Sequence, residues 1–211
     1  MSHRNVTSWL LIVSPILAMA MWIGVAPDTS DMSPSEELAK LSDNETRAMI
    51  GGMLGTLAMV GLLLGQTLLA RGLRAPEKPG AICAEIAGLL IVVLIPVMLI
   101  GSGYTWAAMS ESGTDKALAE AILINGEGAG AMMGTIWSIG LILLGVALVL
   151  QRKFHIAVGY IAIVLAAGIL ISEIGEDVIG DAADAIQMIS WMGMMALSVA
   201  IGILGIVLKD D

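Results

Sequence analysis

The stretch Ile82–Ile100, ICAEIAGLLIVVLIPVMLI, decides the fold class of this chain. It contains one charged side chain, Glu85. A helix rises about 1.5 Å per residue, so such a stretch can cross the roughly 30 Å hydrocarbon core of a bilayer. Five further apolar stretches of similar length lie at Trp9–Ala26, Met49–Ala70, Ala129–Leu150, Ile156–Ser172 and Ile186–Leu208.

These stretches lack the alternation of apolar and polar residues that marks a membrane-spanning strand. Only helices and closed barrels satisfy their backbone polar groups inside lipid. The sequence therefore predicts an all-α bundle of six transmembrane helices, forming a single domain over residues 1–211. The first stretch, with Arg4 before it and Ala18 and Ala20 within it, is similar to a secretory signal peptide. We expect it to be retained as the first span.

Composition narrows the function classes. The chain is 57% hydrophobic and 14% charged, against about 25% charged in a soluble domain, which leaves no room for a separate soluble domain. One cysteine and two histidines argue against a Cys-based metal site and against haem held by two histidines. A net charge of −9 argues against nucleic acid as a partner. No P-loop or G-x-S-x-G motif occurs, and we expect no cofactor. A non-enzymatic protein is favoured over an enzyme built from carboxylates alone, which stays a third hypothesis.

Positive charge is unevenly distributed between the connecting segments. If the N-terminus is inside, seven of the ten Lys and Arg residues lie on the inner side, at Arg4, Arg71, Arg74, Lys78, Arg152, Lys153 and Lys209. The outer segments hold only Lys40, Arg47 and Lys116. The positive-inside rule then predicts that both termini are cytoplasmic, in a prokaryotic inner membrane. The outer segments are acidic, which indicates either a solvated surface or a rim that attracts cations.

The segments also follow a threefold pattern. Inner connections are short, whereas helical sequence occurs outside at Pro34–Leu41 and Thr114–Leu123 and leads into the last span from Gly180. The chain can be read as three copies of a span, an acidic outer helix and a second span. This span order, the acidic outer helices and the glycine-rich even-numbered spans resemble uncharacterised six-span bacterial integral membrane proteins of unknown function. The resemblance implies a fold and no activity.

Small residues recur at helical spacing in two spans. In lipid, such residues let helix backbones approach closely. We predict that these glycines pack helices together, within the bundle or against another subunit. They are Gly51, Gly55, Gly61 and Gly65 in the second span, and Gly126, Gly130 and Gly134 in the fourth.

Fifteen methionines are many for this length, and several gather toward the outer half, among them Met49, Met53, Met188 and Met192. Three interpretations remain open: filling of the apolar core, an apolar ligand pocket, or a Cu(I) path. Neutral polar groups inside the spans are few, at Thr56, Gln66, Ser138, Tyr160 and Ser198.

Carboxylates near the membrane are the remaining candidates for a site, because ionisable groups there are costly. Glu85 lies near the inner end of the third span, and Arg71 or Arg152 could pair with it. Glu173 lies at the outer end of the fifth span, and Arg47 could pair with it or with Glu127. A cation or proton site could form from Glu173, Asp177, Asp181 and Glu85.

The leading hypothesis is a non-enzymatic membrane protein, either a scaffold or accessory subunit or a binder of a small, lipid-like apolar ligand. Its expected partners are membrane lipids, other membrane subunits or a second copy of itself. The alternative is a cation- or proton-coupled transporter or channel with an acidic outer vestibule, gated by Glu173 and Glu85.

Overall fold

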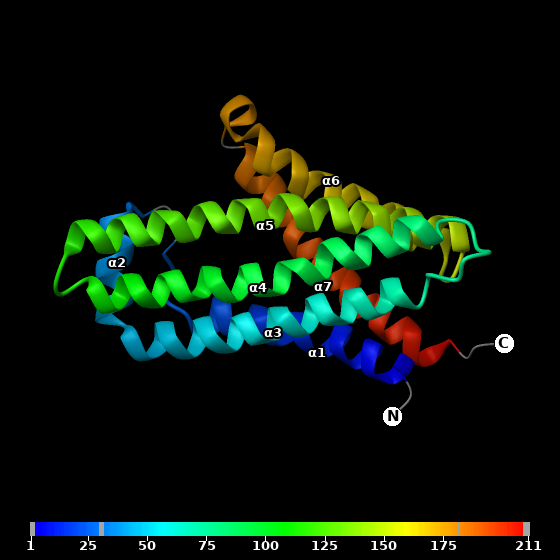
Figure 1. Cartoon of the computed structure of the whole chain (residues 1–211), viewed down its shortest axis with the longest axis horizontal. Helices are drawn as coiled ribbons and strands as arrows, with labels where there is room; N and C mark the ends of the chain where they lie inside the picture. The colour runs from blue at the N-terminus through cyan, green and yellow to red at the C-terminus, as the bar shows by residue number, and fades with distance from the viewer. Residues whose placement is uncertain (1–2, 30–31, 181, 209–211) are drawn as a thin grey trace.

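The computed structural model describes residues 3–29, 32–180 and 182–208, apart from the side chains of residues 127, 176 and 177. Seven helices and no strand lie in these described ranges (Figure 1). Six are long and apolar enough to cross a membrane: α1 (His3–Gly24), α3 (Glu45–Arg71), α4 (Ala81–Glu111), α5 (Lys116–Gln151), α6 (Ile156–Ile179) and α7 (Ala182–Val207). The predicted helical bundle with six spans is confirmed.

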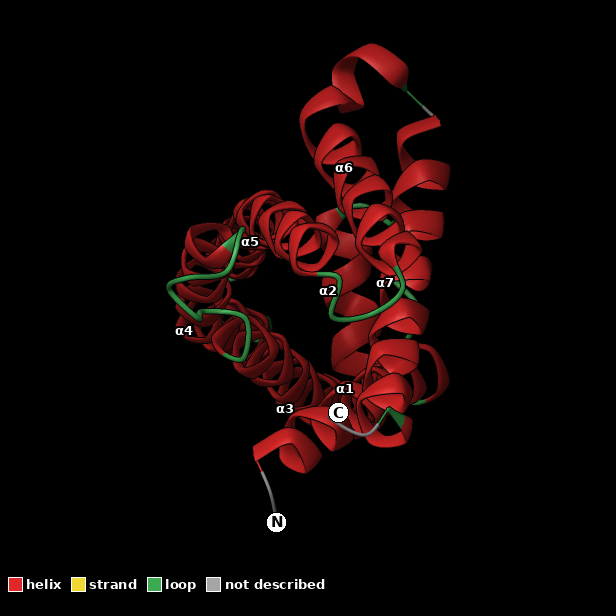
Figure 2. Ribbon diagram, turned by 90° about the vertical axis from the view of Figure 1, so that its right-hand side faces the viewer, coloured by secondary structure: helices red, strands yellow, loops and turns green. Residues whose placement is uncertain are grey.

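The spans are arranged as a closed ring. Each packs mainly on its two neighbours along the chain, and α7 returns to pack on α1. In Figure 2, α3, α4 and α5 are seen nearly end-on, while the α6–α7 hairpin leans away from them. Both ends of the chain lie at the same end of the bundle, as an even number of spans requires (Figure 1).

The short helix α2 (Pro34–Asp43) lies at the other end, where outer helical sequence was predicted. Its Leu38 is buried with Ala108 of α4 and with Ala119 and Leu123 of α5 in a small apolar cluster. At 31 and 36 residues, α4 and α5 are about 46 and 54 Å long, so both extend beyond a 30 Å hydrocarbon core. α2 covers this extension.

The prediction of a separate second outer helix is wrong. The residues from Lys116 onward form the first turns of α5 and continue without interruption into the span. The threefold pattern is therefore present as three helical hairpins, and among the described residues only the first carries a helix of its own.

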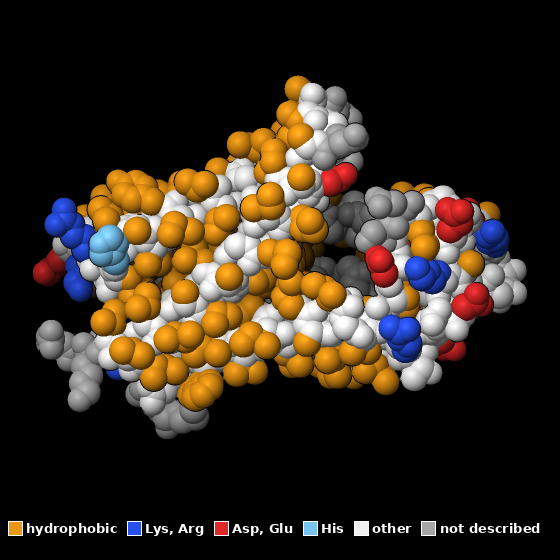
Figure 3. Space-filling view, turned by 180° about the vertical axis from the view of Figure 1, so that it is seen from behind, with side chains coloured by type: hydrophobic (Ala, Val, Ile, Leu, Met, Phe, Trp, Pro, Cys, Tyr) orange, Lys and Arg blue, Asp and Glu red, His pale blue; other side chains and the backbone are white. Residues whose placement is uncertain are grey.

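The surface separates apolar from charged side chains. Large apolar side chains cover the middle of the molecule, and charged side chains gather at its two ends (Figure 3). Such a broad apolar surface is expected where lipid is the solvent.

Candidate functional site

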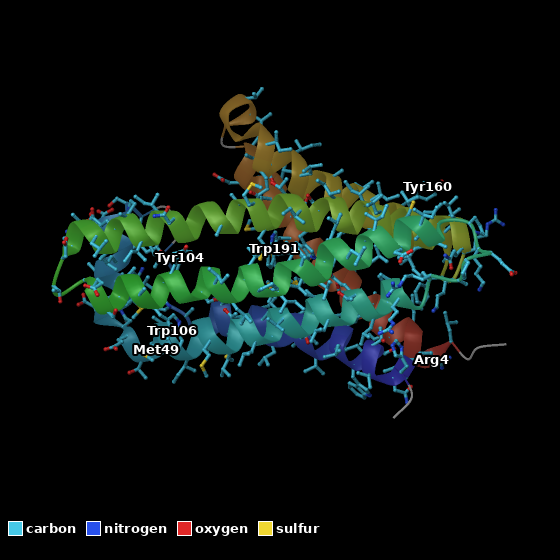
Figure 4. The ribbon with its side chains drawn as sticks, in the orientation of Figure 1. Arg4, Met49, Tyr104, Trp106, Tyr160 and Trp191 are labelled. Atoms are coloured by element: carbon cyan, nitrogen blue, oxygen red, sulfur yellow. The ribbon has the colours of Figure 1, made fainter. Side chains whose placement is uncertain are left out.

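A cavity of about 330 Å³ lies at the α2 end of the bundle, between α1, α3, α4 and α5. Its walls are mostly apolar and include Trp22, Val97, Met98, Trp106 and Met133. In Figure 4, Met49, Tyr104 and Trp106 mark this end of the bundle. The volume is in the range of ligand pockets, which are about 300–1,000 Å³.

Three bare glycines form part of the wall. Gly52, Gly101 and Gly130 each line the cavity, and a Cβ atom added at any of them would meet no atom within 4 Å. A side chain at any of these positions would begin in open space. Gly126 also lines the cavity, but a Cβ there would lie 3.1 Å from the Cβ of Tyr104, so this glycine also packs α5 against α4.

Polar groups in the wall are few. Thr56 and Ser102 are joined through their hydroxyl oxygens at 2.7 Å. Ser102 donates its proton to the carbonyl of Met98 at 3.1 Å, so Thr56 must donate to Ser102. Both hydroxyl protons are then used, and the pair offers lone pairs to an incoming donor. Glu37 of α2 also lines the cavity, and its carboxylate accepts from Thr29 at 3.2 Å.

Tryptophans close the cavity toward the middle of the bundle. Trp22 lies in its wall and packs on Trp191, with ring centroids 5.8 Å apart. Trp191 packs in turn on Trp137 at 5.3 Å (Figure 4 labels Trp191 in the middle of the bundle). These rings belong to the main apolar core, so the cavity ends at packed side chains.

Trp137 also takes part in a buried hydrogen bond that was not predicted from the sequence. The indole N–H of Trp137 donates to Oε1 of Gln66 at 2.8 Å, and both side chains are at most 2% exposed. The Nε2 of Gln66 has no hydrogen-bond partner among the described residues. The available signal was a glutamine inside an apolar span, but its partner lies 71 residues away.

Glu85 lies at the end of the bundle opposite to α2, on the surface. It pairs with Arg74 at 3.5 Å, and the two side chains are 57% and 40% exposed. The prediction that Arg71 or Arg152 would pair with it is wrong. Arg74 precedes α4 in the same short connection, which brings it to the first turns of that helix.

Glu173 lies on α6 away from the cavity lining. Its carboxylate packs directly over Gly134 of α5 and accepts a hydrogen bond at 2.9 Å from Gln187 of α7. Two predicted residues, Glu173 and Gly134, are thus brought together. Arg47 donates instead to the backbone carbonyl of Val25 at 3.1 Å, which corrects its predicted pairing with Glu173.

The other two predicted acidic residues cannot be placed with them. The side chain of Asp177 and the whole of Asp181 lie outside the described residues. In the described part of the chain, no three His, Cys, Asp or Glu side chains gather closely enough to hold a metal ion.

The four glycines predicted to pack α3 face α1 and the segment after it. A Cβ at Gly51 would lie 2.6 Å from the backbone nitrogen of Ala26, and one at Gly65 would lie 3.1 Å from Leu10 and Leu11. Gly55 lies against the indole of Trp22, and Gly61 lies against the hydroxyl of Ser14. A Cβ at Gly51 would therefore meet backbone, whereas at the other three positions it would require side chains of α1 to move.

Gly130 differs from this pattern. It was predicted to pack a helix, but within this chain it lines the cavity and has open space at its Cβ position. Helical spacing identifies small residues, and it does not distinguish a contact from a cavity wall. A close contact that the prediction missed joins α5 and α6, where a Cβ at Gly145 would lie 2.9 Å from the carbonyl oxygen of Gly159.

The methionines divide between the surface, the cavity and the apolar core, where Met59, Met194 and Met195 are buried. Met49, Met53, Met188 and Met192 are exposed on the outside of the bundle. Met98, Met109 and Met133 line the cavity. Thioether side chains adapt their shape to irregular apolar surfaces, so the second group suits an apolar ligand.

No protein family, no curated protein and no solved structure matches this chain.

Proposed function

We propose that this chain is a non-enzymatic membrane protein that binds a small lipid-like molecule in the glycine-walled cavity. The observation that carries the proposal is a ligand-sized space with bare glycines at Gly52, Gly101 and Gly130. Gly51 and Gly145 lie against a neighbouring segment or helix, whereas these three glycines line the cavity and have open space at the Cβ position. A well-formed apolar cavity with a few convergent polar groups is the usual form of a small-molecule site.

The polar groups of the wall indicate the chemical class of the ligand. The Thr56–Ser102 pair offers acceptors, and Glu37 adds a carboxylate. A ligand with an apolar body and a hydroxyl or ammonium group satisfies both. The apolar part would lie against Trp22 and the cavity methionines.

Cation or proton transport has less support. It requires a route that joins Glu173 to Glu85, yet Glu85 lies on the surface beside Arg74 and Glu173 lies off the cavity. Between the two ends, Trp22, Trp191 and Trp137 pack against one another. We therefore favour binding over conduction.

The uneven distribution of Lys and Arg supports placing the α2 end outside a prokaryotic inner membrane and both termini in the cytoplasm. In that orientation the cavity receives its ligand from the outer leaflet or from the outer surface.

The test compares two glycines two residues apart in α5. Gly130 lines the cavity, Gly128 does not, and a Cβ at either meets no atom within 4 Å. Protein purified in mild detergent is analysed by native mass spectrometry for a retained small amphiphile. We expect Gly130→Leu to retain at least about tenfold less than wild type because leucine fills the space, and Gly128→Leu to retain as much as wild type.

A second matched pair of glycines, in α4, repeats the comparison on another helix. Gly101 lines the cavity and Gly103 does not, and both have open space at the Cβ position. Equal retention by Gly130→Leu, Gly101→Leu and wild type would overturn the proposal, as would a wild-type protein that retains and binds no amphiphile. The hypothesis that the chain is a scaffold or accessory subunit would then be the one that remains.

A further inference from the structure

A second cavity, of about 340 Å³, lies at the opposite end of the bundle. It is formed where α1 begins, where α3 and α7 end, and where α5 connects to α6. Figure 4 labels Arg4 at this end, and Figure 3 shows Lys, Arg and His side chains gathered there. This site is separate from the glycine-walled cavity, and the inference does not depend on the proposed function.

The cavity has a basic side. His3, Arg4 and Lys153 line it, and none of its described lining residues is acidic. Arg4 comes from α1 and Lys153 from the α5–α6 connection, so distant parts of the chain bring the two cations to one space. Each of the two side chains also interacts within the chain, and Arg4 has five N–H donors and Lys153 three.

The inner wall is apolar. Leu11, Leu68, Leu69, Phe154, Ile201 and Leu204 line it. The hydroxyl of Ser8 also lines the cavity, and it lies directly beside Gly205. Cations at the opening and a leucine-rich wall behind them match an amphiphile with an anionic head and an alkyl chain.

We propose that this cavity binds an anionic phospholipid, with its phosphate at Arg4 and Lys153 and part of one acyl chain along the leucine wall. Basic pockets between spans on the cytoplasmic side are suited to anionic head groups. Arg and Lys bind phosphate through short, charge-assisted hydrogen bonds. The apolar wall favours a lipid over free phosphate, since inorganic phosphate would leave that wall without a partner.

The test measures retained lipid and thermal unfolding of the full chain with three probes: phosphatidylglycerol, zwitterionic phosphatidylcholine and inorganic phosphate. We expect phosphatidylglycerol to raise the unfolding temperature more than phosphatidylcholine of the same chain length. Inorganic phosphate at matched ionic strength should have no effect. A rise with inorganic phosphate equal to that with phosphatidylglycerol would overturn the lipid assignment in favour of a free anion.

Variants that remove the positive charges of the cavity test whether phosphatidylglycerol binds there. Arg4→Gln with Lys153→Gln should weaken phosphatidylglycerol binding about tenfold or more and leave the unfolding temperature in phosphatidylcholine unchanged. Lys78→Gln is the control, because Lys78 is an exposed cation of the α3–α4 connection, at the same end, that does not line the cavity. If the double variant does not fold, Lys153→Gln alone decides, because Lys153 lies in an exposed connection. Wild-type affinity in these variants, or an equal loss in Lys78→Gln, would overturn the proposal.

Discussion

Gly51 and Gly52 are adjacent in α3, yet their surroundings are opposite. Gly51 lies against the backbone of Ala26, whereas Gly52 opens into the cavity. Intrinsic helix propensity favours alanine over glycine by up to about 1 kcal/mol at either position. The difference between the two substitutions therefore reports the surroundings alone.

We expect Gly51→Ala to lower the free energy of unfolding by about 1–3 kcal/mol, because its Cβ would lie 2.6 Å from a backbone nitrogen that cannot easily move. Gly52→Ala should be neutral or slightly stabilising. Equilibrium unfolding in detergent measures both. Equal effects of the two substitutions would show that Gly51 does not pack closely against the segment after α1.

Gln66 and Trp137 form a buried side-chain pair between α3 and α5. Hydrogen bonds between spans contribute about 0.6 kcal/mol on average and up to about 1.7 kcal/mol. In a double-mutant cycle of Gln66→Leu and Trp137→Phe, we expect a coupling energy of about 1 kcal/mol. Additive effects in unfolding measurements would contradict the hydrogen bond.

At the scale of elements, Ser33 is the N-cap of α2, and its backbone N–H and hydroxyl both donate to the Glu36 carboxylate, at 3.0 and 2.6 Å. The side-chain hydrogen bond and then the backbone hydrogen bond lower the pKa of Glu36 below its usual 4.5. The ionised form is favoured in the folded helix. This contribution to stability is therefore present above pH 4.5 and is lost as pH falls through the lowered pKa.

A carbon-13 NMR titration of the Glu36 carboxyl group checks this cap. The wild-type pKa should lie below 4.5, and Ser33→Ala should raise it partway toward 4.5, since alanine keeps the backbone N–H and loses the hydroxyl. An unchanged pKa in Ser33→Ala would contradict the side-chain contribution.

Elements were predictable where their pattern is local. The six spans follow from apolar length, and α2 follows from Pro34 after Ser33 and the acidic residues of its first turn. The continuation of the outer helical sequence at Thr114–Leu123 into the span was not predicted. The helix continues because α4 runs beside it and Leu38 of α2 packs on both. These are tertiary contacts, and the sequence of α5 itself does not indicate them.

At the scale of the molecule, the ring brings together residues that no single stretch of sequence connects. The glycine-walled cavity takes residues from five helices, α1 to α5. The sequence could indicate that methionines and glycines are abundant in the outer half. It could not indicate that Gly130 borders open space whereas Gly134 lies against the Glu173 carboxylate, because the two glycines belong to the same helical spacing.

Topology is the first whole-molecule prediction. In a Cys83→Ala background, Thr114→Cys marks the α4–α5 connection and Glu77→Cys the α3–α4 connection, and both positions are exposed. A membrane-impermeant maleimide added to intact cells should label Thr114→Cys and spare Glu77→Cys, because the inner connections carry most of the Lys and Arg. The reverse pattern would place the glycine-walled cavity on the cytoplasmic side.

The central claim is that the space between α1, α3, α4 and α5 holds an amphiphile. Anomalous diffraction from crystals grown with a bromine-labelled fatty alcohol locates the alkyl chain directly. We predict bromine peaks inside the bundle, beside Gly52, Gly101 and Gly130. Bromine peaks confined to the lipid-facing surface, with side chains filling the space between those helices, would contradict the account.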